Sequence, residues 1–563
     1  PSRAQARLES VSTATERPLR RLVGSSRANP LPHSGTISVF LLAVVTLTGI
    51  YITLFYEYGF SASYDAVAEI NDHPVQRFMR TAHRYSSAAL VVTTLVHAWR
   101  IFVAGRFTGG RRFRWLTGVA ALLLIWLAGV TGYWLVWDVR GQALAEALER
   151  VIGDVGWGAA FVVDMLVGSG AGSGAGLMVF VWFLHLLLTA VIAWFLWRHL
   201  RASRLPWLPP RHWMVLMGGG LALVSLALPA ELLDPGDPAR LVPDMPLDPF
   251  MLFLLPPLLS DQAALVALLA VVVAGALAVV PWVLRDRTIE VVEIDDERCT
   301  GCELCVVDCP YLALDMRTRP DGSSRASLAV VDPKACVGCG ICLGSCSFGA
   351  ITLHGHEAAD DVEPAGRAVI VACRRHLQQF GLRHDELGPP DEVETVEVQC
   401  TGMFHPQAVG DLVAKGATSV QIVGCAPGEC AYGIGNELTS QRLDGSRAPH
   451  VPRAHAGVAT EDYVALGDLA RATSDPGAHP ATDRSALPEQ RRVRAAAALV
   501  TAVSLMAIAA ATLLPFGGES GAAVRVVVDH EPGQQLIGQL EPSGGSGGPT
   551  EVLIEVDGVL ERQ

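Results

Sequence analysis

The sequence predicts a membrane-embedded, all-α bundle of six helices, then an α+β domain and an α/β domain outside the bilayer, and one further transmembrane helix near the C-terminus. Half of the 563 residues are hydrophobic, and many of them lie in seven apolar segments. The length of each segment is close to the about 20 residues that a helix needs to cross a bilayer. All 12 cysteines lie between Cys299 and Cys430. Within that region, three runs rich in β-branched residues each end in a cysteine, which favours a parallel sheet.

The distribution of charge between the apolar segments predicts their orientation. These segments are 36–55, 83–104, 116–137, 177–197, 212–230, 262–284 and 495–515. The loops after the second and fourth segments carry arginines and no acidic residue, whereas the loop at 231–261 is acidic. Since positively charged loops stay in the cytoplasm, we expect a multi-pass protein of the inner (cytoplasmic) membrane. Its N-terminus and its cysteine region would be cytoplasmic, and its C-terminal tail extracytoplasmic.

Two segments carry histidines at the same spacing. His83 and His97 are 14 residues apart, so on a helix they face the same side, roughly 21 Å apart along the axis. His185 and His199 repeat this spacing in the fourth segment, which runs parallel to the second. One such histidine is commonly an interfacial or packed residue, but ionisable groups inside a membrane are costly and usually functional. Four of them in two layers predict two b haems, one between His83 and His185 and one between His97 and His199.

Glycines in the first and third segments repeat the interval of 14. Gly35 and Gly49 form one pair, and Gly118 and Gly132 form the other. Glycine allows a bulky planar ligand to approach a helix backbone closely. Ordinary membrane-helix glycines would explain any one of them, but four in register with the histidines indicate haem contacts.

Three arginines lie next to the predicted haem ligands: Arg84, Arg100 and Arg198. Each would be placed to pair with a haem propionate. The alternative is the ordinary positive charge of a membrane interface.

Residues 30–285 resemble cytochrome b of the quinol-oxidising cytochrome bc complexes. The stretches "AHRYSS", "LVHAWRIF" and "TGYWLVWD" are especially similar to its split, chloroplast-like form. The resemblance implies a four-helix di-haem bundle followed by helices that border a quinone site, and a homodimeric core. It also implies that His83 and His185 hold the outer, lower-potential haem. The family's Pro-Glu-Trp-Tyr motif is missing, because Pro249-Phe250-Met251-Leu252 stands in its place.

Eight cysteines form two runs of the kind that bind iron–sulfur clusters. "CTGCELCVVDCP" (299–310) and "CVGCGICLGSC" (336–346) match the bacterial two-cluster ferredoxin pattern, in which the fourth cysteine of each run ligates the other cluster. The alternative is a zinc ribbon, which needs only four thiolates. The predicted ligands of one [4Fe–4S] cluster are Cys299, Cys302, Cys305 and Cys346. Those of the other are Cys336, Cys339, Cys342 and Cys309.

The remaining cysteines follow predicted strands. Cys373, Cys400 and Cys425 end the runs "RAVIVAC", "VETVEVQC" and "SVQIVGC", and Cys430 follows five residues later. The carboxyl ends of parallel strands meet at one edge of a sheet, so these thiols should converge. Four thiolates suit a [2Fe–2S] cluster, with zinc or a disulfide as the alternatives.

The stretches "VQCTGMFHPQ" and "IVGCAPGECAYGIGN" resemble the delta subunit of methyl-viologen-reducing hydrogenase over roughly 366–445. The resemblance implies a [2Fe–2S] domain that relays electrons between a flavin- or hydrogenase-containing partner and other iron–sulfur proteins. The likeness is weaker at Cys373, where "ACRRH" replaces a more cysteine-rich start.

Together these features predict a membrane-bound electron-transfer subunit of a quinone-linked oxidoreductase complex. It would connect a cytoplasmic flavin-, NAD(P)H-, heterodisulfide-reductase- or hydrogenase-type partner with the quinone pool, because the chain has no nucleotide-binding fingerprint of its own. One alternative is a bc-type quinol oxidase, bifurcating or confurcating, that sends electrons inward to the clusters. Another is a non-enzymatic membrane anchor. An extracytoplasmic electron carrier is a further candidate partner, and nucleic acid is not.

The predicted domains follow from these motifs. They are a cytoplasmic segment (1–29), the di-haem domain (30–204), two helices bordering a quinone site (205–288), the ferredoxin-like domain (289–358), the delta-subunit-like domain (359–445), a linker (446–492), a transmembrane helix (493–516) and the tail (517–563).

Overall fold

The structure is a computed structural model of the whole chain. It describes residues 30–103, 105–108, 111–155, 175–237, 242, 245–284, 290–319, 326–354, 362–374, 376–377, 387, 391–425, 430, 432–455 and 458–462, together with 11, 501, 553–556 and 559–562. The chain divides into two compact units, Pro1–Phe516 and Gly517–Gln563.

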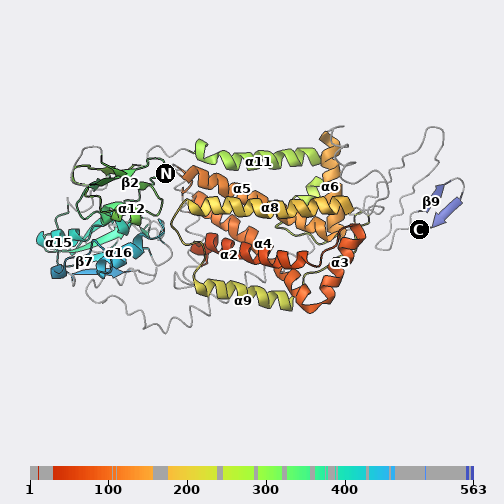
Figure 1. Cartoon of the computed structure of the whole chain (residues 1–563), viewed down its shortest axis with the longest axis horizontal. Coiled ribbons are helices and arrows are strands. Elements are labelled where there is room, and N and C mark those ends of the chain that lie inside the picture. Colours follow the sequence, from red (N-terminus) through yellow and green to blue (C-terminus); the bar gives the residue numbers. More distant parts are fainter. Residues whose placement is uncertain are drawn as a thin grey trace. The chain divides into compact units, whose positions relative to one another are not determined.

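Apolar helices dominate the first part of the larger unit and run along a common direction (Figure 1). Five of the described helices are long and apolar enough to cross a membrane. They are α2 (Ser34–Thr53, extended to Leu31 by the short helix η2), α4 (Pro74–Val103), α5 (Arg112–Val136), α8 (Ala175–Arg201) and α11 (Ala263–Val283). This confirms a multi-pass membrane protein.

The other two predicted segments have different outcomes. Segment 212–230 forms the apolar helix α9 (Arg211–Ala227), whose 17 residues are fewer than the about 20 that span a bilayer without help. Segment 495–515 lies outside the described residues except for position 501, so the C-terminal transmembrane helix stays a prediction.

Helix pairing in the bundle brings the predicted haem ligands together with the predicted glycines. Helix α2 packs along α4, and α5 packs along α8. Helix α9 lies against α4, and α11 lies against α5. The bundle core includes Leu41, Ala89 and Trp213, none of which is more than 1% exposed. Each histidine-bearing helix therefore lies beside a glycine-bearing helix.

Two loops of the bundle contain helices that the sequence analysis does not anticipate. These are α3 (Phe60–Asp72) and α6 (Val139–Val155). On α3 the residues Ala66, Val67 and Ile70 recur at helical spacing and are buried. Both helices are too polar to span a membrane, so a search for long apolar segments passes over them.

The ferredoxin-like part consists of two similar halves. Strand β1 (Glu293–Ile294) pairs antiparallel with β4 (Ile351–Thr352), and β2 (Leu314–Thr318) pairs antiparallel with β3 (Ser327–Val331). Each half contains one short helix, α12 (Leu304–Asp308) or α13 (Ile341–Ser345). The residue before each helix, Glu303 or Gly340, has a left-handed backbone. The repeated turn matches the repeated cysteine pattern.

A parallel sheet follows, as predicted. Its strands are β5 (Ala368–Cys373), β6 (Val393–Val398), β7 (Val420–Val423) and β8 (Ala459–Asp462), in the order β6-β5-β7-β8. Helix α15 (Gln407–Ala414) connects β6 to β7, and α16 (Gly435–Leu443) follows β7. Strand β8 lies within the predicted linker 446–492 and extends the sheet to Asp462 through parallel pairing with β7. Because β8 contains polar residues, its sequence lacks the apolar pattern from which the other strands of the sheet are predicted.

The smaller unit contains one described hairpin. Strands β9 (Leu553–Val556) and β10 (Val559–Arg562) pair antiparallel.

Candidate functional site

The four histidines lie in two layers inside the bundle. The ring centroids of His83 on α4 and His185 on α8 are 6.4 Å apart. That spacing fits two imidazoles sharing one iron atom with metal–nitrogen bonds of about 2 Å. His97 lies near His199, 14 residues further along the same two helices. The structure thus brings the four predicted ligands together as two pairs.

Threonines on the neighbouring helices orient three of the four imidazoles. Thr131 Oγ1 lies 3.0 Å from His185 Nδ1, and Thr117 Oγ1 lies 3.1 Å from His199 Nδ1. Thr48 Oγ1 lies 3.2 Å from His83 Nδ1, which also hydrogen-bonds the carbonyl oxygen of Val45 at 3.0 Å. With Nδ1 engaged, Nε2 is the nitrogen left for a metal, as in known metal-binding histidines. The sequence analysis missed these threonines, although each directly precedes a predicted glycine.

The glycines leave space at the same imidazoles. A Cβ atom on Gly35 would lie 2.7 Å from the ring of His97, and one on Gly49 would lie 3.0 Å from the ring of His83. The corresponding distances are 3.5 Å from Gly118 to His199 and 3.4 Å from Gly132 to His185. Each predicted glycine therefore lies against one predicted ligand, so the residues of the bundle fit two bis-histidine haems.

The three arginines differ in their surroundings. Arg84 forms an ion pair with Asp248 at 2.8 Å, and Tyr133 OH donates to the same carboxylate oxygen at 2.9 Å. Arg84 Nη1 is buried and has no hydrogen-bond partner within the described residues, so this donor remains for a ligand such as a propionate. Arg198 is exposed, and Arg100 is half-buried. Asp248 is a site residue that the sequence analysis did not identify.

The loop that replaces the Pro-Glu-Trp-Tyr motif is packed into the bundle. Met251 is 1% exposed, and its sulfur would lie only 2.2 Å from a Cβ on Gly129 of α5. Trp126 Nε1 donates to the carbonyl oxygen of Met251 at 2.9 Å. Asp248 Oδ1 accepts from the backbone N–H of Phe250 at 2.8 Å, which fixes the start of the turn. A methionine side chain thus fills this part of the bundle.

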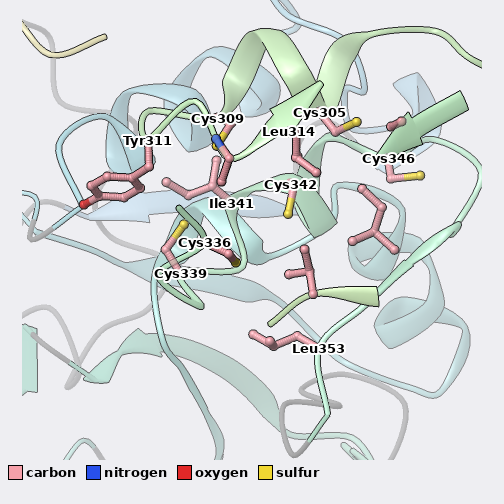
Figure 2. Packing of buried hydrophobic residues seen from close by; sticks show 14 of the residues in the cluster. Cys305, Cys309, Tyr311, Leu314, Cys336, Cys339, Ile341, Cys342, Cys346 and Leu353 are labelled. Atoms are coloured by element: carbon pink, nitrogen blue, oxygen red, sulfur yellow. The ribbon is translucent and has the colours of Figure 1, made fainter. Parts of the chain in front are cut away.

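The eight ferredoxin-type cysteines line two separate cavities. One cavity is lined by Cys299, Cys302, Cys305 and Cys346, and the other by Cys309, Cys336, Cys339 and Cys342. Figure 2 shows the division, with Cys305 and Cys346 on one side of Leu314 and Cys336 and Cys339 on the other. Cys309 and Cys346 each cross to the cavity of the other run. Two four-thiol cavities fit two [4Fe–4S] clusters.

Burial and mutual repulsion affect the acidity of these thiols. Burial raises the pKa of Cys305 and that of Cys339 to about 12, and neighbouring thiols add to both shifts. Burial also raises the pKa of Cys342. A cluster binds thiolates, so iron must displace protons that these cysteines would otherwise hold at neutral pH.

The last four cysteines lie at the carboxyl edge of the parallel sheet. Cys373 Sγ and Cys425 Sγ are 3.8 Å apart, at the ends of neighbouring strands. Cys400 and Cys430 are hydrogen-bonded to each other, which raises the pKa of Cys400 and lowers that of Cys430. A Cβ on Gly435 would lie against both of these sulfurs. Within the described residues, no group of three or more His, Cys, Asp or Glu side chains forms a compact site for one metal ion.

Contacts join the end of α8 to the ferredoxin-like part. The backbone N–H of Arg204 donates to the carbonyl oxygen of Pro310 at 3.0 Å, and its Nη1 donates to that of Val307 at 2.7 Å. The guanidinium carbon of Arg114 lies 5.5 Å from the ring centre of Tyr311. Pro310 and Tyr311 directly follow Cys309, and Arg204 is five residues beyond His199.

These features define a cytochrome b-type membrane protein fused to iron–sulfur domains. Residues 22–204 match the family Cytochrome b/b6/petB, 298–350 match the 4Fe–4S dicluster domain, and 372–448 match Methyl-viologen-reducing hydrogenase, delta subunit. Both resemblances and the dicluster prediction are therefore confirmed, whereas the [2Fe–2S] assignment stays a prediction.

Individual relatives are similar to the haem part. Cytochrome b6 of Prochlorococcus marinus (strain MIT 9303) and that of strain NATL1A are each 28% identical over 163 residues, which is 29% of this chain and 73% of theirs. A solved chain titled "Hyperthermophilic respiratory Complex III" aligns over 45% of this chain and 75% of its own, with 15% identity and a TM-score of 0.36.

Proposed function

We propose that the chain transfers electrons between a cytoplasmic redox partner and the quinone pool in the membrane. The bound haems and clusters would supply the one-electron chemistry. The protein contributes the arrangement: two cysteine-lined cavities, a third cysteine set beside them, and two layers of oriented histidines. The partner is a flavin-, NAD(P)H-, heterodisulfide-reductase- or hydrogenase-type subunit, as the delta-subunit likeness suggests.

The observation that carries this proposal is the hydrogen bond between Arg204 and Pro310. It joins the peptide next to Cys309 to the segment that continues from His199. A short covalent and hydrogen-bonded path therefore connects a cysteine of the second cavity with a histidine of the His97–His199 layer. This favours electron exchange between the iron–sulfur part and the layer that the charge pattern assigns to the cytoplasmic side.

The packed loop at Met251 favours this function over quinol oxidation on the other side of the bundle. The family places a glutamate where this chain has Phe250, and the nearby carboxylate of Asp248 is paired with Arg84. Neither group offers a free proton acceptor to a quinol. Quinol oxidation and a purely anchoring role remain the alternatives that experiments should distinguish.

Spectroscopy of the purified full chain tests the cofactors. A reduced-minus-oxidised spectrum should contain a b-type α band with two haems per chain, and EPR should detect [4Fe–4S] and [2Fe–2S] signals. Absence of the α band would contradict the haem assignment. A single cluster type would contradict the three-cluster count.

Replacement of His97 tests the route. In membrane vesicles, His97→Ala should remove one haem per chain and abolish reduction of a quinone analogue by a low-potential donor that reduces the clusters. His354→Ala is the control, because His354 is exposed outside the bundle. Unchanged quinone reduction in His97→Ala would rule out this route.

A further inference from the structure

A buried cluster of charged residues lies where the ferredoxin-like part meets the α/β part. We call Asp308, Arg442 and Arg447 the charge cluster. Arg442 Nη2 is 2.9 Å from Asp308 Oδ2, and Arg447 Nη2 contacts Asp308 Oδ1. The side chains of Asp308 and Arg442 are 0% and 1% exposed, whereas that of Arg447 is 28% exposed.

Arg442 donates hydrogen bonds to residues beside all three sets of cysteines. Its Nη2 donates to Ser345 Oγ at 2.7 Å, and its Nη1 donates to the carbonyl oxygen of Gly402 at 2.7 Å. Ser345 precedes Cys346 of the first cavity, and Asp308 precedes Cys309 of the second. Gly402 is two residues beyond Cys400. One guanidinium therefore lies among the three sites.

The surrounding chain is shaped to admit this guanidinium. A Cβ on Gly344 would lie 2.4 Å from Arg442 Nη1, so only glycine leaves room at that position of α13. Ser345 Oγ also donates to Asp308 Oδ2 at 2.8 Å. The contacts thus fix the cation relative to the two crossing cysteines, Cys309 and Cys346.

The charge cluster carries more positive than negative charge. Two guanidinium groups share one carboxylate, which leaves a net charge of about +1 in a buried environment, where charges act over longer distances than in water. Reduction of an iron–sulfur cluster adds one electron and hence one negative charge. Nearby net charge is among the factors that set cluster potentials.

We propose that the charge cluster raises the reduction potentials of the centres beside it, chiefly the two [4Fe–4S] clusters, with Arg442 as the principal positioning residue. The inference rests on the proposed function, because it requires the clusters to be present. The cation stabilises the reduced state of each cluster, so each accepts an electron more readily than it would without Arg442. No proton transfer is involved.

Potentiometric titration followed by EPR on the purified full chain tests this inference. In Arg442→Met the potentials of the [4Fe–4S] clusters should fall, with an about tenfold lower ratio of reduced to oxidised cluster at a fixed potential, equivalent to about 59 mV. In Asp308→Asn they should rise, because the variant removes the negative charge. Arg442→Lys should restore most of the wild-type value.

Two further variants keep the test interpretable. Arg447→Met removes a partly exposed cation, so it should fold even if Arg442→Met does not, and it should lower the potentials by a smaller amount. Arg367→Met is the matched control, since Arg367 pairs with Glu394 at the amino end of the sheet, opposite the edge that carries the cysteines, and its loss should leave the potentials unchanged.

The possible results distinguish failure of this inference from failure of the proposed function on which it rests. Opposite shifts in Asp308→Asn and Arg447→Met support it, since a purely structural defect would not change sign. Unchanged potentials, or shifts in the same direction, in variants that retain both clusters overturn it alone. Absence of [4Fe–4S] signals from the wild-type chain would overturn both.

Discussion

Three of the four predicted haem ligands meet a threonine and a glycine that are adjacent in sequence on the neighbouring helix. The threonine bonds Nδ1 and the glycine leaves room beside the ring, so one dipeptide both orients and accommodates an imidazole. The pairs are Thr48–Gly49, Thr117–Gly118 and Thr131–Gly132. At the fourth ligand, His97, the residue before Gly35 is Ser34.

Removal of one threonine hydroxyl should weaken haem binding. We expect Thr131→Val to loosen the haem at His185 by about 10- to 100-fold, the usual effect of losing a group that orients a metal ligand. Haem content and the potentials of the two haems in the purified chain measure this. Thr189→Val is the control, because Thr189 bonds the backbone oxygen of His185 and not its ring. Equal effects of the two variants would contradict an orienting role.

Substitution of glycine by alanine should have a large effect beside a haem ligand and a small effect elsewhere in the bundle. Gly35→Ala should displace His97 and reduce haem occupancy in that layer, at a cost of about 1–3 kcal/mol, because the new Cβ would lie 2.7 Å from the ring. Gly219→Ala on α9 should be nearly neutral, since among the described residues outside its own stretch of helix no atom lies within 4 Å of its added Cβ. Haem occupancy and thermal inactivation of both variants provide the comparison. Full occupancy in Gly35→Ala would show that the helices can adjust.

At the scale of elements, the parallel sheet shows what a strand pattern can and cannot reveal. Strands β5, β6 and β7 are rich in β-branched residues and end at or just before a cysteine, so both their direction and their shared edge could be predicted. Strand β8 (Ala459–Asp462) is half acidic, and only its pairing with β7 identifies it as a strand. The short helix α13 is likewise important for its tertiary contacts, because its residues Gly344 and Ser345 contact Arg442.

Substitution of the sheet-edge cysteines tests the third cluster. Cys400→Ser should abolish the [2Fe–2S] EPR signal and retain both [4Fe–4S] signals, because its sulfur adjoins Cys430 at the sheet edge. Cys373→Ser should do the same if Cys373 is the fourth ligand, as its 3.8 Å separation from Cys425 suggests. An unchanged signal in Cys373→Ser would assign the fourth ligand elsewhere, and loss of all signals would indicate misfolding.

At the scale of the whole molecule, the chain contains only two lysines, and both lie in the iron–sulfur region. Lys334 is exposed and Lys415 is partly exposed. If that region is cytoplasmic, a membrane-impermeant amine reagent should label Lys334 in inside-out vesicles and not in right-side-out vesicles. Mass spectrometry of the labelled peptide measures this, and Lys334→Arg is the control. Labelling in right-side-out vesicles would reverse the predicted orientation.

Much of the haem and cluster pattern could be predicted from the chain alone, because it depends on local periodicity. Intervals of 14 residues place His83 and His97 on one helix face, and the short C-x2-C spacings bring cysteines to one loop whatever surrounds them. The apolar helices could be predicted for the same reason. Five of the seven expected segments are described helices of spanning length, because that length follows from composition and from the thickness of a bilayer.

Contacts between distant segments had to come from the tertiary structure. Asp248 lies beside Arg84, Met251 fills the space at Gly129, and Arg442 reaches both Asp308 and Ser345, although more than 90 residues separate the partners in each case. No periodicity links such positions, since each contact depends on how whole helices and domains pack. The sequence thus indicates which cofactors the chain can bind, and the fold decides which charges and hydrogen bonds surround them.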